Sequence, residues 1–285
     1  MNELCLANLT VAEAAPLEVI DAAAAGGFGS VNLWLVEPPA LAHFRHVKRP
    51  GASVVGDATS IEAIRRRCRE RAVGVFTASA GWIGPDFTTA MIAPVIETLA
   101  ALEARSLCVV GWDPDRSRLM EHFIAACEAA ARYRLAVHLE FMAYSAIRTV
   151  REARDFLAQA SQPNARLIID ALHLDRSGGT PEDVAALEPT VIASVQLCDA
   201  PGARPPRTAL RDESVNARLL PGEGDLPLFA LMDALPEDVV IELEAPGASL
   251  FGLSIEERAK RCGAASRRFL AEYAAMKASR SNRPH

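Results

Sequence analysis

Short apolar runs recur along the chain and are separated by stretches with helical periodicity. Continuous apolar runs predict parallel strands, because strands covered on both faces are apolar throughout rather than alternating. Each run is followed by a helical segment, and no glycine-rich GxGxxG turn is present, which favours a closed barrel over an open sheet. We therefore predict an α/β fold, a single-domain (β/α)8 TIM barrel. Its strands are predicted at residues 4–9, 30–36, 72–77, 106–111, 135–141, 167–170, 191–197 and 239–243.

Several predicted helices begin with a capping sequence, in which Ser or Thr precedes an acidic residue by three positions. The helix that follows the first of these sequences is predicted to end at Gly26-Gly27. One of the sequences also places a proline at the first helical position. The capping sequences lie at residues 10–13, 59–62, 180–183 and 254–257.

Two connections are long, and the sequence predicts no regular structure for them. Residues 37–58 are rich in Pro and Gly, and such long connections in a compact domain are often functional. The residues before Pro221 form a second loop, about twenty residues long and rich in Pro and Arg. We find no linker, so we predict one domain at residues 1–276 and a polar tail at residues 277–285.

The composition and net charge favour a globular protein and argue against a nucleic-acid-binding or membrane protein. Half of the 285 residues are apolar and 23% are charged, which suits a globular domain. The net charge of −6 argues against a nucleic-acid partner, which usually requires a basic surface. The six cysteines show no CxxC spacing, and we find neither a signal peptide nor an apolar run of about 20 residues. We expect a cytoplasmic protein with reduced thiols and no membrane partner.

Four successive strands each end in an oxygen-bearing side chain. Alternate residues of a barrel strand point inward, and the carboxyl ends of the strands carry the active site. Three carboxylates at one mouth repel each other unless a cation lies between them. The pattern predicts a divalent metal, and an all-oxygen donor set favours Mn²⁺ or Mg²⁺ over Co²⁺ or Zn²⁺. The predicted ligands are Glu140, Asp170, Gln196 and Glu244.

Each of these side chains, taken alone, has a simpler interpretation as a loop anchor or helix partner. Asp199 lies just past the end of strand seven. Glu242 has the same parity as Glu244 but lies one layer deeper. We interpret Glu242 as a residue that supports the site or pairs with His138.

The C-terminal half of the sequence resembles the xylose isomerase-like TIM-barrel superfamily, the sugar phosphate isomerase/epimerase group. The N-terminal half matches it only in architecture. The resembling segments are HLEFMAYSAIRT (138–149), LIIDALHLDRSGG (167–179), VQLCDAP (195–201), ARLLPGEGDLPL (217–228) and IELEAP (241–246).

The resemblance implies a metal bound by Glu, Asp, His and Glu at the ends of strands five to eight, which are Glu140, Asp170, Gln196 and Glu244 here. Gln196 departs from the pattern, since most relatives carry His there, and an amide oxygen is a weaker donor. The resemblance also implies that His173 and Arg218 contact substrate oxygens.

An enzyme of this group would isomerise or epimerise a sugar, sugar phosphate or keto-polyol through a cis-enediolate. Glu140 and Glu244 would be its metal-ligating acid and base. A metal-dependent dehydratase of a keto-polyol or dehydroshikimate-like acid is an alternative that uses the same enolate, with His173 as a candidate acid.

A degenerate barrel that binds a ligand without turnover is the other alternative, and Gln196 favours it. The apurinic endonuclease branch is disfavoured by the small number of histidines and the negative charge. We expect a small carbohydrate-like substrate, and a homodimer or homotetramer is consistent with the resemblance. Trp34, Trp82 and His43 are candidate pocket walls, although packing is the favoured interpretation of each.

Overall fold

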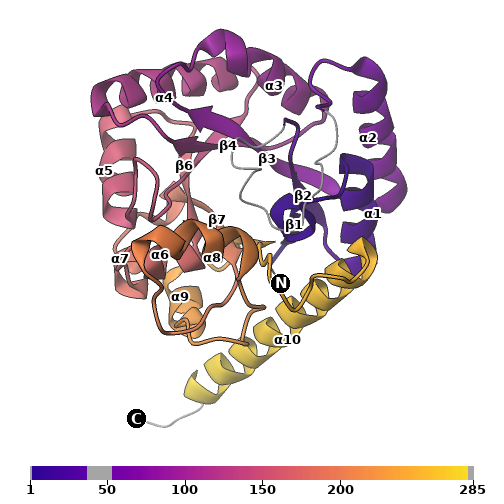
Figure 1. Cartoon of the computed structure of the whole chain (residues 1–285), viewed down its shortest axis with the longest axis vertical. Coiled ribbons are helices and arrows are strands. Elements are labelled where there is room, and N and C mark those ends of the chain that lie inside the picture. The colour runs from indigo at the N-terminus through magenta and orange to yellow at the C-terminus, as the bar shows by residue number, and fades with distance from the viewer. Residues whose placement is uncertain (1, 37–52, 282–285) are drawn as a thin grey trace.

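Eight parallel strands close into one barrel in chain order, with β1 paired to β8 (Figure 1). The computed structural model describes residues 2–36 and 53–281. It confirms the predicted (β/α)8 fold. The strands are β1 (Leu4–Ala7), β2 (Ser30–Leu33), β3 (Gly74–Ile83), β4 (Ser106–Gly111), β5 (Ala136–Glu140), β6 (Ala165–Asp170), β7 (Ile192–Leu197) and β8 (Val240–Leu243).

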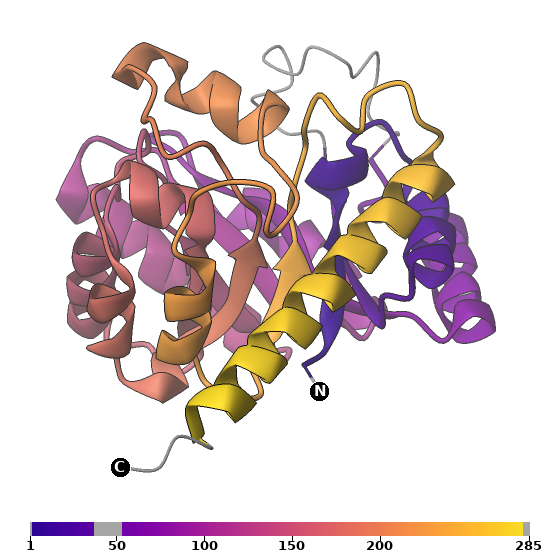
Figure 2. The ribbon, with the colours of Figure 1, turned by 90° about the horizontal axis from the view of Figure 1, so that it is seen from below.

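Helices surround the barrel (Figures 1 and 2). Within the described residues, no helix combines the length and apolar character that a membrane crossing requires. The described part of the chain also contains three short 3₁₀ helices, η1 (Asn8–Val11), η3 (Pro189–Val191) and η4 (Arg207–Ala209). The α-helices are α1 (Pro16–Gly26), α2 (Ala58–Arg71), α3 (Thr89–Ala101), α4 (Arg116–Ala131), α5 (Val150–Ala160), α6 (Ala171–Arg176), α7 (Pro181–Ala185), α8 (Leu210–Asn216), α9 (Leu228–Ala234) and α10 (Ile255–Ser281).

The main core lies between the strands and the helices. All six residues of β4 are buried, as expected for a strand covered on both faces. Phe123 of α4 packs edge-to-face on Phe156 of α5, with ring centroids 5.2 Å apart. Cys5, Cys108 and Cys198 are buried in their strands or at the strand ends, and all six cysteines are free thiols.

The start of the first helix was predicted wrongly. Residues 8–11 form η1, and α1 begins at Pro16, where the carboxylate of Glu18 accepts from the backbone N–H of Ala15. Thr10, the expected cap, has another role. Its hydroxyl donates to the carbonyl of Leu243 and accepts from the backbone N–H of Ala245, both at 3.0 Å. Thr10 therefore ties the end of β1 to the end of β8.

Strand β3 is longer than predicted, because it continues past the predicted end at residue 77 to Ile83 and pairs with β4 over this stretch. The register shifts between Ser79 and Gly81, so this stretch contains a bulge that the apolar pattern does not show. The bulge places Trp82 near the carboxyl end of the strand.

The Pro- and Arg-rich loop before Pro221 was predicted to be irregular, but it contains η4 and α8. A buried ion pair holds α8 on α6, because Glu213 accepts two hydrogen bonds from Arg176, at 2.9 and 2.7 Å. In Figure 2, α8 lies above the carboxyl ends of the strands. This contact is made by residues far apart in the chain, which explains why local sequence did not predict the helix.

Two other boundaries bear on the predictions. Most of the long connection at residues 37–58, including His43, lies outside the described residues. Helix α10 begins with the predicted capping box, in which the backbone N–H of Glu257 donates to the hydroxyl of Ser254. It continues to Ser281, so residues 277–281 of the predicted tail are helical.

Candidate functional site

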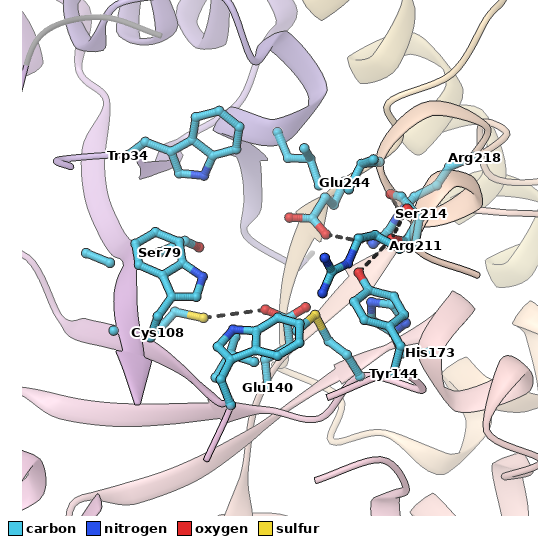
Figure 3. Close-up of a pocket in the computed structure, with 18 residues that line it drawn as sticks. Trp34, Ser79, Cys108, Glu140, Tyr144, His173, Arg211, Ser214, Arg218 and Glu244 are labelled. Carbon is cyan, nitrogen blue, oxygen red and sulfur yellow. Dashed lines mark hydrogen bonds and ion pairs between the residues drawn. The ribbon is translucent and has the colours of Figure 1, made fainter. Parts of the chain in front are cut away.

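A pocket opens at the carboxyl ends of the strands, with about 700 Å³ of empty space measured out to its opening. Four of the six predicted site residues line it. Figure 3 shows Trp34, Ser79 and Cys108 on one side and Glu244, Arg211 and His173 on the other. The predicted site residues in its wall are Glu140, His173, Arg218 and Glu244.

Asp170 lies beneath the pocket wall and joins two elements. It is the N-cap of α6, and its Oδ1 accepts from the backbone N–H of His173 at 2.8 Å. Its Oδ2 accepts from a guanidinium nitrogen of Arg218 at 2.6 Å. The spacing of three residues between Asp170 and His173 is therefore that of a helix cap. The cap fixes both side chains at the end of β6.

Arg218 holds two of the predicted ligands together. Its guanidinium pairs with Asp170 and lies 3.1 Å from Oε2 of Glu244. Its Nε donates to the carbonyl of Ser214 in α8 at 2.7 Å. The side chain is only 1% exposed, and the two carboxylates raise the pKa of Arg218 well above its ordinary value although burial opposes this. Arg218 is therefore a fixed positive charge in the floor of the pocket.

Gln196 contacts Glu244 but leaves one atom without a partner. The register pairs Gln196 with Asp170 on one side and with Glu242 on the other. Its amide Nε2 reaches Oε1 of Glu244 at 3.4 Å. Its Oε1 is buried and has no hydrogen-bond partner among the described residues. A buried unpaired carbonyl oxygen is costly, so this atom is a candidate ligand.

Glu140 enters the pocket from the end of β5 and has the weakest protein partners. Its Oε2 accepts from the thiol of Cys108 at 3.6 Å (Figure 3). Burial raises its pKa well above the usual range, and the charges of Glu244 and Asp170 raise it further. Glu140 lacks the neutralising partner that Asp170 has.

Burial and neighbouring charges also shift the pKa values of Glu244, Asp170 and His173. Burial raises the pKa of Glu244 to about 8, although Arg218 opposes this. At Asp170 burial also acts upward, but Arg218 and His173 outweigh it, so the pKa of Asp170 lies below its ordinary value. Burial lowers the pKa of His173 to about 4, which leaves the imidazole neutral near pH 7.

The donor set fits a divalent cation. Glu140, Asp170 and His173 each offer a ligand atom, and these atoms lie within 4.8 Å of one another. The carboxylates of Glu140, Asp170 and Glu244 carry three negative charges when ionised, against the single positive charge of Arg218. A divalent cation would balance the remaining two charges and remove the reason for the raised pKa values. Compared with the predicted ligands, this group has His173 in place of Gln196 and Glu244.

Glu242 supports the barrel interior rather than the pocket. Its carboxylate accepts from Ser194 at 2.5 Å and from Asn32 at 3.0 Å, one layer below Glu244. The suggested pairing with His138 is not found. His138 is buried beside Phe76, and its Nδ1 has no partner in the described part of the chain. Burial lowers its pKa to about 3.

Asp199 is a loop anchor. Its two carboxylate oxygens accept from the backbone N–H groups of Ala200, Gly222, Gly224 and Leu226, at 2.9 to 3.0 Å. These bonds fold the loop that follows α8 back onto β7.

The aromatic side of the pocket was largely missed. Trp34 and Trp82 were named as candidate walls but interpreted as packing, and both line the pocket. Trp112, Tyr144 and Arg211 also line it and were not predicted. A signal was present, because Gly-Trp pairs occur near the ends of two successive strands, at residues 81–82 and 111–112. Arg211 could not be found without knowing that α8 exists.

Comparisons with known proteins agree with this architecture. The IolI protein, solved with a bound zinc atom, superposes with a TM-score of 0.76 at 15% identity, over 95% of this chain and 99% of that one. The 3-keto-D-glucoside 4-epimerase YcjR of E. coli superposes with a TM-score of 0.68 at 17% identity, over 94% of this chain and 99% of that one. The probable 3-DHS dehydratase AsbF of Bacillus anthracis superposes with a TM-score of 0.70 at 15% identity, over 92% of this chain and 97% of that one.

These identities are low, so the superpositions establish the fold alone. No curated protein matches the chain in sequence. A family model for the xylose isomerase-like TIM barrel matches residues 20–271, which is most of the chain and includes every predicted site residue. The chain therefore belongs to the xylose isomerase-like TIM barrel family.

Proposed function

We propose that the protein is a divalent-metal-dependent isomerase or epimerase of a carbohydrate-like α-hydroxy ketone or aldehyde. The observation that carries this proposal is the charge imbalance at the barrel mouth. Three buried carboxylates lie at the mouth with one buried guanidinium, which pairs with Asp170 and Glu244. Glu140 and Glu244 line the pocket. Buried acids without partners are expensive, and sites that keep them usually bind a metal or move protons.

The residues present define a division of roles. Asp170, Glu140 and Glu244 would hold the cation, with Gln196 or His173 as a further donor. The bound cation would polarise a substrate carbonyl and so lower the pKa of the neighbouring C–H. Arg218 would keep Asp170 and Glu244 in place by its ion pairs.

The proton transfer belongs to Glu140 and Glu244. One carboxylate would take the proton from the carbon next to the carbonyl, and the substrate would become a cis-enediolate. Return of the proton to the other carbon, with transfer of the hydroxyl proton between the two oxygens, gives the isomer. Delivery of a proton by the second carboxylate to the opposite face of the same carbon gives the epimer. Both carboxylates point into the pocket in Figure 3, as such a pair requires.

The comparisons support this class of reaction without choosing a substrate. The similar structures include a protein with a bound zinc atom and a 3-keto-D-glucoside 4-epimerase. A D-allulose 3-epimerase of Methylomonas also superposes, with a TM-score of 0.66 at 14% identity. Zinc in one neighbour adds an ion to the Mn²⁺ and Mg²⁺ that an oxygen-rich donor set favours.

The alternatives are less well supported by the geometry. A dehydratase that uses His173 as its acid needs a protonated imidazole, and burial holds the pKa of His173 at about 4. A barrel that only binds a ligand has no need for two carboxylates with raised pKa values in its pocket wall.

The first test is the metal content of the purified protein and of two matched variants. We expect about one equivalent of Mn, Mg, Co or Zn in the wild type. Glu244→Gln should lose the metal, whereas Glu242→Gln, which alters the layer below, should keep it. A protein that purifies without metal and is not thermally stabilised by adding these ions would contradict the proposal.

Proton abstraction can be measured before the substrate is known. Ketoses and keto-polyols are incubated in D2O with the metal-loaded protein, and NMR follows deuterium incorporation next to the carbonyl. Loss of a general base typically lowers a rate by 10² to 10⁴. We expect Glu140→Gln to reduce exchange by about that factor.

A further inference from the structure

All three tryptophans of the chain line the one pocket that holds the candidate ligands. Trp34 follows β2, Trp82 lies in β3 and Trp112 follows β4, so they come from three successive strands. Each indole is partly exposed. The pocket therefore has two walls, an aromatic wall from β2 to β4 and a polar wall from β5 to β8.

The three indoles are not equivalent. The guanidinium of Arg211 lies over the rings of Trp112 and Tyr144, 5.1 and 5.3 Å from their centroids. Those two rings also stack on each other, with centroids 6.1 Å apart. Arg211, Trp112 and Tyr144 thus form one packed group that continues into α8. The indole of Trp82 stacks on no aromatic ring and no cationic side chain of the described residues, although it lines the pocket.

We propose that the substrate is a six-membered ring that stacks on Trp82, with its oxygens turned to the polar wall. This assignment deepens the proposed function and rests on it, since it names the class of substrate for the same site. A hydroxylated six-membered ring gathers C–H groups on its faces and carries its oxygens at its rim, so it matches one aromatic and one polar wall.

An open-chain polyol fits these walls poorly. Its hydroxyls lie on all sides of the carbon chain, so some of them would be buried against the indole without a hydrogen-bond partner. Each such hydroxyl would give up its hydrogen bonds to water without gaining a replacement, which weakens binding. The pocket should therefore discriminate between a ring and a chain that have the same number of carbons and hydroxyls.

The test uses the matched probes myo-inositol and D-glucitol, each with six carbons and six hydroxyls. Tryptophan fluorescence reports binding directly, because every tryptophan lies in this pocket. We expect myo-inositol to bind the metal-loaded protein at least 10-fold more tightly than D-glucitol. Trp82→Leu should remove that preference, and Trp82→Phe, which keeps an aromatic face, should retain it.

Metal content of each variant separates this inference from the proposed function. Trp82→Leu should keep its metal, since Trp82 is not in the donor set. A protein without metal that still prefers myo-inositol, through Trp82, would refute the proposed function and support the ring site. Equal affinities, tighter binding of D-glucitol, no binding of myo-inositol, or an unchanged preference in Trp82→Leu would overturn the ring assignment.

Discussion

At the scale of single residues, the barrel interior contains more buried acid than it can neutralise. Asp170 has a partner for each oxygen, whereas the one hydrogen bond that Glu140 accepts from the described residues comes from a thiol at 3.6 Å. Glu242 accepts two neutral hydrogen bonds, which lower its pKa, but burial raises that pKa to about 7. The buried acids of the interior therefore differ in pKa because their partners differ: the pKa of Asp170 is lowered, whereas those of Glu140 and Glu242 are raised.

Glu242 should make the metal-free protein less stable as the pH rises from about 4.5 to about 7. The folded state keeps a proton in this window that the unfolded chain, with an ordinary carboxyl pKa, has released. The shift corresponds to roughly 3 kcal/mol. In Glu242→Gln the loss of stability should be smaller by about this amount, because position 242 no longer titrates, while Glu140 and Glu244 still do.

Urea unfolding at pH 5 and pH 7.5, in the presence of a chelator, measures the effect. Glu62→Gln is the control, since the side chain of Glu62 is 60% exposed. If Glu242→Gln and the wild type lose the same stability between these two pH values, the buried Glu242 carboxyl is not responsible.

At the scale of the elements, an acid after an apolar strand has two different structural roles here. Asp170 caps α6 and faces a guanidinium, so it belongs to the site. Asp199 collects four backbone N–H groups and has no role in the donor set. The sequence left two interpretations of such an acid open, as a metal ligand or as a loop anchor. The number of backbone donors around each one separates them.

Asp199→Asn should destabilise the protein by about 2 to 4 kcal/mol, because an amide has one acceptor oxygen for four donors. The loop should loosen, and Arg218 should be disturbed because the next residue, Leu219, pairs with position 199. Unfolding experiments measure the loss, and metal affinity measures the effect on the site.

Asp225→Asn provides the comparison, since one Asp225 oxygen accepts a single hydrogen bond, from the exposed N–H of Gly202. We expect it to cost less than about 1 kcal/mol. Similar losses in the two variants would argue against the anchoring role of Asp199.

At the scale of the whole molecule, the first and last helices close the outer layer. Helix α10 crosses the outside of the barrel and packs on α1 (Figure 2). Gly26 and Gly263 allow the close approach, because a Cβ on Gly263 would overlap the carbonyl of Gly26. A Cβ on Gly26 would lie 2.6 Å from the carbonyl oxygen of Ala259.

Gly263→Ala should therefore destabilise the protein by about 1 to 3 kcal/mol, the usual cost of overpacking. The sign of the change in the free energy of unfolding is informative, because alanine in a helix interior otherwise stabilises a protein by about 1 kcal/mol relative to glycine. Thermal unfolding checks it. Gly29→Ala, where a Cβ would meet no atom within 4 Å, should change little. A stabilised Gly263→Ala variant would refute the close contact between α1 and α10.

The sequence by itself determined the barrel and the acids at its mouth. Continuous apolar runs, the capping boxes of α7 and α10 and the glycine end of α1 depend on neighbours in the chain, so they can be read locally. The other two predicted capping sequences were wrong, because α1 begins at Pro16 and α2 is capped by Asp57, whose carboxylate accepts from the backbone N–H of Thr59. The placement of Glu140, Asp170 and Glu244 at successive strand ends follows from the same pattern, since parallel strands end on one side. The identity of their partners did not follow.

Only the tertiary structure decided which residues meet at the site. Arg218 pairs with Asp170 across 48 positions of sequence, and α8 forms in a Pro- and Arg-rich loop because Glu213 meets Arg176. The aromatic wall exists because the barrel brings three separate strand ends together, and the bulge in β3 sets the position of Trp82. Contacts of this kind depend on closure of the barrel, and no local pattern encodes them.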